Sequence, residues 1–255
     1  MSAPLHLAIG HTEAAAKEEV EAIAEILELG ELEVVFQPIF DVRAGNAFGY
    51  ESLSRSPTEI FAGPLEMFHA AAASRQVGKL GRLQREISIR EAPPGPLFLN
   101  VHPAEFDHPL LIQPDDPIFR HHSDIYLEIT ESAPLRYFEQ CTHVLGELRQ
   151  KGIRLVIDDF GAGFSNVKYI SDLAPDIVKL DRELIAGVRE GSRQFKLYNS
   201  VVRLCKEMGA KVVSEGIETT PELVVAVRAE VDFCQGYLLG KPEQDPNVDT
   251  WPGFG

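Results

Sequence analysis

Carboxylates, an amide and a lysine recur where short apolar runs of the sequence end. Two aspartates, Asp158 and Asp159, stand side by side after the run "IRLVI". Adjacent carboxylates repel each other, and their burial is costly unless a positive group lies between them. Polar residues hold similar positions at or near the ends of other runs: Glu51, Asn100, Glu128, Glu131, Lys179, Asp181, Glu215 and Gln235. If these ends meet in the fold, the sequence predicts one acidic site.

An acidic site of this composition predicts bound divalent cations. Its five central carboxylates are Glu51, Glu128, Asp158, Asp159 and Glu215. Left without a cation, they would raise one another's pKa values. Oxygen ligands joined by the amide of Asn100 suit hard ions such as Mg²⁺ or Mn²⁺, and no His/Cys set has zinc spacing. Because Mg²⁺ usually takes one or two carboxylates, two ions are predicted. A two-metal site can clamp the attacking and leaving oxygens of a displacement at phosphorus.

The apolar runs that carry these residues are typical of buried β-strands. Eight are predicted, at residues 32–39, 47–53, 97–101, 125–130, 153–158, 176–181, 211–215 and 232–237. Several are nearly continuous in apolar residues, as expected for parallel strands covered on both faces. Helical patterns over 137–152, 195–209 and 220–230 separate later strands, with Thr220 predicted as the last N-cap. Residues 12–29 predict a further, amphipathic helix.

Alternating strands and helices indicate a parallel α/β fold, and eight strands favour a TIM-type barrel. The first two strands are joined by the turn "RAGN", which is too short for a helical crossover, so they are predicted to be antiparallel. The expected fold is therefore a TIM-like (β/α)8 barrel with one antiparallel strand near the N-terminus. A single domain over 1–255 is expected, with a core at about 18–243 and a peripheral tail at 244–255. No G-x-G-x-x-G motif follows a strand, which disfavours a dinucleotide-binding fold.

Composition narrows the classes of protein to consider. The chain has 255 residues and a formal net charge of −15, which disfavours a broad basic surface for polymeric nucleic acid. No apolar run approaches the roughly 20 residues that span a bilayer, and the N-terminus lacks a signal pattern. Cys141, Cys205 and Cys234 form no C-x-x-C pair and are expected to be reduced thiols. A cytoplasmic location is predicted.

The segments around these positions resemble EAL-domain cyclic di-GMP phosphodiesterases. Eight motifs occur in the family's order between about residues 18 and 243: "FQPIF", "GYESLSR", "LNVHP", "LEITES", "DDFGAGFSN", "IVKLD", "SEGIET" and "CQGYLLGKP". Three positions depart from the family pattern. Ser52 replaces the alanine of the signature, Ala162 stands where threonine is common, and His102 stands where serine is frequent. No matched ligand is lost, which favours an active enzyme.

The resemblance implies hydrolysis of one phosphodiester bond of cyclic di-GMP, giving linear pGpG, with two Mg²⁺ or Mn²⁺ ions. The implied metal ligands are Glu51, Asn100, Glu128, Asp158, Asp159 and Glu215, with Asp158 bridging both ions. The implied catalytic residues are Lys179, Glu215 and Glu51. Lys179 would contact the attacking water, and it could act as a base only if its pKa were depressed. The implied substrate contacts are Gln37, Leu53, Arg55 and Gln235. Glu131 would anchor the loop after Asp159.

Other functions remain open at this point. A catalytically silent cyclic di-GMP-binding regulatory module would share the same motifs. A barrel glycosidase could use two of the carboxylates, but the sole Trp251 lies in the tail, where docking onto the body is expected rather than sugar stacking. The kinase-like "DFG" lacks a Gly-rich loop and an H-R-D segment. By resemblance, a homodimer is also expected, and the resemblance is compatible with a sensory partner domain or protein.

Overall fold

The protein forms a closed barrel of eight strands in sequence order. The structure is a computed structural model that describes residues 5–107, 109–130, 136–162, 167–246, 248 and 251. Within that part of the chain, the strands are β1 (Glu33–Asp41), β2 (Asn46–Arg55), β3 (Leu97–Asn100), β4 (Ile125–Thr130), β5 (Arg154–Phe160), β6 (Ile177–Leu180), β7 (Lys211–Ser214) and β8 (Phe233–Cys234). Each predicted strand therefore has a counterpart, with bounds that differ by a few residues.

The strand β1 runs antiparallel to both of its neighbours, β2 and β8, and the remaining pairs are parallel. This confirms the prediction of a TIM-like barrel with one antiparallel strand. The pairing of β1 with β8 covers only Phe40 with Cys234 and Asp41 with Phe233. Beyond it, Glu243 pairs with Phe36 through backbone N···O distances of 2.7 and 3.1 Å. The chain after β8 thus helps to close the barrel.

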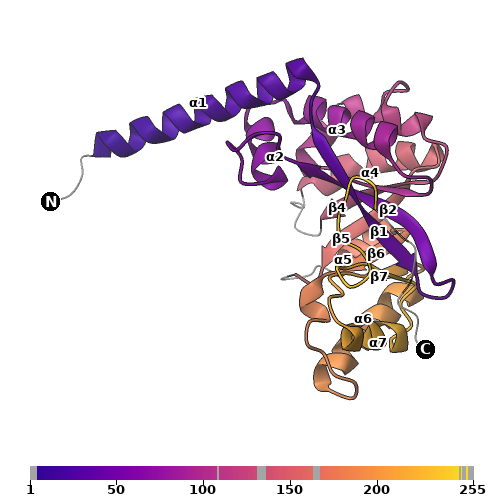
Figure 1. The fold of residues 1–255 in the computed structure, drawn as a ribbon. Coiled ribbons are helices and arrows are strands. Elements are labelled where there is room, and N and C mark those ends of the chain that lie inside the picture. Colours follow the sequence, from indigo (N-terminus) through magenta and orange to yellow (C-terminus); the bar gives the residue numbers. More distant parts are fainter. Residues whose placement is uncertain are drawn as a thin grey trace.

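Helices follow or precede most strands and cover the outside of the barrel. They are α1 (Leu5–Leu29), α2 (Pro64–Ala73), α3 (Val77–Glu91), α4 (Arg136–Gln150), α5 (Lys168–Leu173), α6 (Arg193–Glu207) and α7 (Thr220–Arg228). Short 3-10 helices are η1 (Pro103–Asp107), η2 (Pro109–Ile112), η3 (Pro117–Arg120) and η4 (Arg182–Leu184). The helix predicted to begin at residue 12 begins at Leu5, and its N-terminal part projects away from the barrel (Figure 1).

One predicted helix cap is wrong by one residue. The N-cap of α7 is Thr219 rather than Thr220, because Thr219 has an extended backbone and Thr220 is already helical. The backbone N–H of Thr219 donates to the Glu222 carboxylate at 3.0 Å, which satisfies a donor that the helix leaves free.

The apolar core has two parts, one between the strands and the helices and one inside the barrel. The inner part is a layer of side chains from seven strands, joined by Phe48 from β2: Ile39, Phe98, Tyr126, Val156, Ile177, Val213 and Phe233. Phe98 stacks on Tyr126, and Phe48 stacks on Phe233, each at a centroid distance of 4.4 Å. The barrel is therefore filled, as in other TIM-type barrels, and its floor is apolar.

Two further expectations concern single features of the chain. Cys205 and Cys234 are buried free thiols, as predicted, and the side chain of Cys141 lies outside the described residues. In the part of the chain that the structure describes, no helix has both the length and the apolar composition to cross a membrane.

Candidate metal centre and active site

A polar layer lies directly above the apolar layer inside the barrel. Side chains two positions apart on a strand point to the same face. The residues two positions after the apolar layer on β3 to β8 are Asn100, Glu128, Asp158, Lys179, Glu215 and Gln235. On the antiparallel β1, Gln37 precedes Ile39 by two positions and pairs with Glu51 of β2. These predicted site residues therefore meet at the end of the barrel where the parallel strands finish.

Lys179 lies at the centre of this polar layer. Its Nζ atom is 3.0 Å from Glu51 Oε2, and it is similarly close to three further carboxylate oxygens. These are Glu128 Oε1 at 2.9 Å, Asp158 Oδ1 at 3.2 Å and Glu215 Oε1 at 2.7 Å. An ammonium has three N–H donors, so it cannot donate to four carboxylates at once. The site therefore holds more negative charge than Lys179 can satisfy.

Glu51 is the best satisfied of these carboxylates. It accepts hydrogen bonds from Lys179 Nζ at 3.0 Å, Asn100 Nδ2 at 3.1 Å and Gln235 Nε2 at 2.7 Å. Burial alone would raise the pKa of Glu51, but Lys179, Gln235 and Asn100 together outweigh it and lower that pKa. Gln235 also donates to Gln37 Oε1 at 3.1 Å, and Gln37 donates to the Gly240 carbonyl at 3.0 Å. Gln235 therefore holds Glu51 directly, and Gln37 holds Gln235, next to the pairing of β1 with β8 that closes the barrel.

Asp158 and Asp159 reach the same site through a distorted strand. The sequence suggested that the strand ends between them, but β5 continues to Phe160. Asp159 instead adopts a left-handed backbone with φ of +56°, and the pairing with β6 shifts between Ile157 and Phe160. This irregularity breaks the alternation that would turn Asp159 away. Aspartate tolerates this conformation better than most residues, although it costs on the order of 1 kcal/mol.

The other carboxylates of the site are poorly stabilised as anions. Burial and neighbouring carboxylates raise the pKa values of Glu128 and Glu215 well above the ordinary range and also raise that of Asp158. Burial and the charge of Asp158 raise the pKa of Asp159 to about 6. Burial alone would lower the pKa of Lys179, but the surrounding carboxylates outweigh it and raise that pKa well above its usual value. The surrounding carboxylates therefore favour the ammonium form of Lys179 in the metal-free site.

The donor set fits two divalent cations. Glu51, Glu128 and Asp158 can bring ligand oxygens within 4.8 Å of one another, and so can Asp158, Asp159 and Glu215. The two groups share Asp158. Glu128 Oε2 is buried and has no hydrogen-bond partner among the described residues. If the five carboxylates are ionised, Lys179 leaves four negative charges, which two divalent cations would balance.

Comparison with known proteins identifies the family of this barrel. The model of the EAL domain matches residues 20–242. The chain belongs to the EAL domain family. EAL domains use divalent metal ions as cofactors. This EAL domain is 27% identical over 240 residues to the cyclic di-GMP phosphodiesterase NbdA of Pseudomonas aeruginosa, covering 87% of the chain and 30% of NbdA.

Two further relatives agree with this assignment. The probable cyclic di-GMP phosphodiesterase PdeG of Escherichia coli is 25% identical, covering 87% of this chain and 46% of PdeG. The structure of Klebsiella pneumoniae BlrP1 in complex with manganese and cyclic di-GMP superimposes with a TM-score of 0.72 at 29% identity, covering 83% of this chain and 56% of BlrP1. The chain spans about a third of the length of several curated relatives and less than half of PdeG.

Several residues predicted for the EAL domain site lie away from the acidic cluster. Leu53 and Arg55 follow Glu51 on the same face of β2 towards the rim, and Arg55 Nη1 donates to the Ser54 carbonyl at 3.0 Å. Asp181 caps η4 by accepting from Glu183 N at 2.7 Å. Glu131 lies outside the described residues.

Two residues outside the predicted metal ligands have local structural partners. His102 Nδ1 accepts from Ala104 N at 3.2 Å, so this nitrogen is occupied within its own turn. Trp251 packs against Phe40 at a centroid distance of 5.8 Å, as expected for a tail that docks onto the body.

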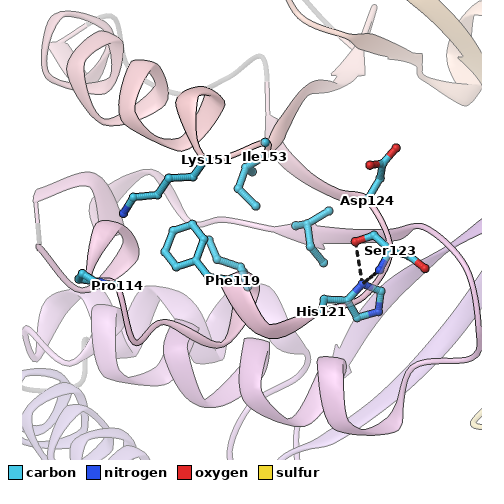
Figure 2. A pocket seen from close by; sticks show the side chains of 10 residues that line it. Pro114, Phe119, His121, Ser123, Asp124, Lys151 and Ile153 are labelled. Carbon is cyan, nitrogen blue, oxygen red and sulfur yellow. Dashed lines mark hydrogen bonds between the residues drawn. The ribbon is translucent and has the colours of Figure 1, made fainter.

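A separate cavity of about 470 Å³ lies at the opposite end of the barrel, where β4 and β5 begin (Figure 2). Its polar groups bond locally. His121 Nδ1 lies 3.0 Å from the Ser123 carbonyl, and Lys151 Nζ donates to the Ile112 carbonyl and lies over the Phe119 ring. Among the described residues that line this cavity, there is no carboxylate cluster like the one around Lys179. The carboxylate clusters found among the described residues therefore lie at the other end of the barrel.

The raised pKa of Asp159 predicts a pH effect on the metal-free EAL domain. Its pKa rises from an ordinary 3.8 to about 6, so the protonated form favours folding. That contribution is complete below pH about 4 and is lost as the pH rises through about 6. We expect metal-free Asp159→Asn to lose less thermal stability than the wild type between pH 4 and 7. Melting temperatures are recorded against pH in the presence of a chelator. The same pH dependence in wild type and Asp159→Asn would contradict the raised pKa of Asp159.

A second charged cluster escaped the sequence analysis. Arg85, Glu105 and Asp116 form a fully buried network behind β3. Arg85 lies in α3, Glu105 in η1 and Asp116 at the start of η3. Glu105 and Asp116 are 20 and 31 positions from Arg85 in the sequence, and no motif predicts their contact. The signal in the sequence is the spacing of Arg85, which places it on the same face of α3 as the buried Gly81 and Ser88.

Proposed function

We propose that this EAL domain is an active, metal-dependent phosphodiesterase that hydrolyses one phosphodiester bond of cyclic di-GMP to linear pGpG. The observation that carries the proposal is a set of carboxylates and one amide around Lys179 of β6, contributed by β2, β3, β4, β5 and the residue after β7: Glu51, Asn100, Glu128, Asp158, Asp159 and Glu215. The choice of substrate is supported by two relatives: NbdA is a cyclic di-GMP phosphodiesterase, and BlrP1 was solved with bound cyclic di-GMP. We further propose that two Mg²⁺ or Mn²⁺ ions are held by these residues, with Asp158 shared between them.

The negative charge of the site explains why cations are needed for this substrate. Cyclic di-GMP is an anion, and an acidic mouth would repel it. Two bound divalent cations would remove that repulsion, activate water and stabilise the charge that develops on the phosphate oxygens. Arg55, which lies on the Glu51 face near the rim, then offers a guanidinium to a phosphate oxygen. Leu53 offers an apolar surface beside it.

The residues of the chain would divide the remaining work. Lys179 would orient the attacking water through an N–H of its ammonium, the form that the surrounding carboxylates favour in the metal-free site. Glu51 remains an anion because three donors hold it. Glu215 has the most exposed side chain of the four carboxylates around Lys179, at 16%, so it is the one best placed to meet water. Gln235 would orient Glu51 by donating a hydrogen bond to it, and Gln37 would hold Gln235 in place.

A product assay tests the proposed function. The purified chain is freed of metal and incubated with cyclic di-GMP and either Mg²⁺, Mn²⁺ or a chelator. We expect linear pGpG with either metal and none with the chelator, measured by chromatography. Activity that survives the chelator would contradict a metal-dependent mechanism. Light scattering on the same sample tests the homodimer that the family resemblance predicts.

The same assay identifies the alternative function. A catalytically silent regulatory module would bind cyclic di-GMP without releasing product. Calorimetric binding under the assay conditions, with no pGpG after prolonged incubation, would therefore replace the proposed enzyme by a binding module.

A further inference from the structure

A buried ionic network lies behind the strand that carries Asn100. Arg85 Nη1 donates to Glu105 Oε2 at 2.6 Å, and Arg85 Nη2 and Nε donate to the two Asp116 oxygens at 2.9 and 3.2 Å. All three side chains are fully buried. Burying three charges is costly, and removing one partner leaves the others uncompensated. Such a network therefore holds its elements, α3, η1 and η3, in a defined arrangement.

Glu105 connects this network to the end of β3. Val101 N still donates to the Glu128 carbonyl at 3.0 Å, as part of the ladder with β4. His102 N is the first N–H beyond that ladder, and it donates to Glu105 Oε1 at 3.1 Å. Since Asn100 lies only two residues earlier, Glu105 fixes the direction in which the chain leaves Asn100. Glu105 Oε2 thus accepts a hydrogen bond from Arg85, and Glu105 Oε1 accepts one from the backbone of the turn.

Helix α3 is also tied to the strand that carries Glu51. Ser88, three residues after Arg85, lies with its hydroxyl oxygen 2.7 Å from that of Ser52, which follows Glu51. Both serines are fully buried. Through Ser88, α3 therefore contacts the residue that follows Glu51, and through Arg85 it contacts Glu105, which holds the turn after Asn100. Asn100 and Glu51 are themselves joined by the 3.1 Å hydrogen bond.

We propose that Arg85 and Glu105 are positioning residues that hold Asn100, and through it Glu51, in the orientation that binds metal. The proposal rests on the proposed metal site. Residues that orient metal ligands from behind change metal affinity by about 10- to 100-fold when they are lost. The network therefore acts on the affinity for metal before any substrate is present.

A pair of glycine substitutions tests the proposal without removing a charge. A Cβ added at Gly81 would lie 2.0 Å from Glu105 Oε2, so Gly81→Ala must displace that carboxylate. Gly146 in α4 has nothing within 4 Å of an added Cβ, so Gly146→Ala is the matched control. Mn²⁺ is titrated into each metal-free protein and free Mn²⁺ is followed by electron paramagnetic resonance. We expect Gly81→Ala to bind Mn²⁺ about tenfold more weakly, with Gly146→Ala unchanged.

A second pair separates positioning from general stability. Glu105→Gln keeps one acceptor oxygen for two donors, so either Arg85 or His102 N loses its partner. Asp116→Asn weakens the same arginine network but leaves Glu105 bonded to His102. We expect only Glu105→Gln to weaken Mn²⁺ binding, although both variants lower the melting temperature.

The outcomes distinguish this inference from the proposed function. Wild-type Mn²⁺ affinity in both Gly81→Ala and Glu105→Gln would overturn the positioning role. Equal weakening in Glu105→Gln and Asp116→Asn would also overturn it, because that result reports stability alone. Failure of the wild type itself to bind Mn²⁺ would instead refute the metal site on which the inference rests.

Discussion

Asp158→Ala is expected to abolish hydrolysis of cyclic di-GMP, with turnover lowered by on the order of 10³-fold or more. Asp158 belongs to both groups of carboxylates that can hold a cation. Its loss removes a ligand from each group at once. Metal ions at such sites supply several kcal/mol of charge stabilisation, and each 1.4 kcal/mol or so is tenfold in rate. Turnover of purified protein, measured as pGpG released at saturating Mn²⁺, checks the expectation.

A carboxylate at the other end of a neighbouring strand provides the matched control. Asp124 directly precedes β4 and pairs with Arg154 at 3.1 Å, away from the acidic cluster. We expect Asp124→Asn to keep near-normal turnover. Folding of both variants is compared by circular dichroism. Near-normal turnover in folded Asp158→Ala would refute its assignment as a shared ligand.

Lys179→Met is expected to lower turnover by on the order of 10² to 10³-fold, as loss of a preorganised donor does elsewhere. The Michaelis constant should change much less, because Lys179 is buried beneath the mouth and orients water in the proposed mechanism. The same change removes a cation that lies among four close carboxylates. We therefore also expect the metal-free protein to lose about 3–5 kcal/mol of stability. Steady-state kinetics and chemical unfolding measure the two effects.

Lys179→Arg separates charge from geometry in this prediction. Arginine keeps the positive charge but replaces a compact ammonium by a planar fork. We expect it to restore part of the metal-free stability and little of the turnover. A weaker affinity with an unchanged maximal rate in Lys179→Met would contradict the role in orienting water.

Much of the site could be predicted because parallel strands bury both faces. Their apolar runs are easy to recognise, and a polar residue at the end of such a run is conspicuous. Glu128 and Lys179 each follow an inward apolar residue by two positions, so strand alternation alone brings them to one layer. The turn between the first two strands is short, and its length alone predicted that β1 and β2 are antiparallel.

The features that escaped prediction depend on tertiary contacts or on single backbone conformations. The predicted strand ends at residue 158, yet β5 continues to Phe160, and Asp159 takes a left-handed backbone within it. Neighbouring Thr219 and Thr220 offer the same cap chemistry, so only the backbone decides between them. The contact of Arg85 with Glu105 joins a helix to a short 3-10 turn, and no periodicity connects the two.

The central claim is that this EAL domain hydrolyses cyclic di-GMP through two metal ions that share Asp158. Titration of the metal-free chain with Mn²⁺, with bound metal and pGpG formation measured on the same samples, tests it most directly. The account predicts two Mn²⁺ ions per chain and turnover that appears only as the second ion binds. Full turnover with one ion per chain, or two bound ions without any pGpG, would contradict it.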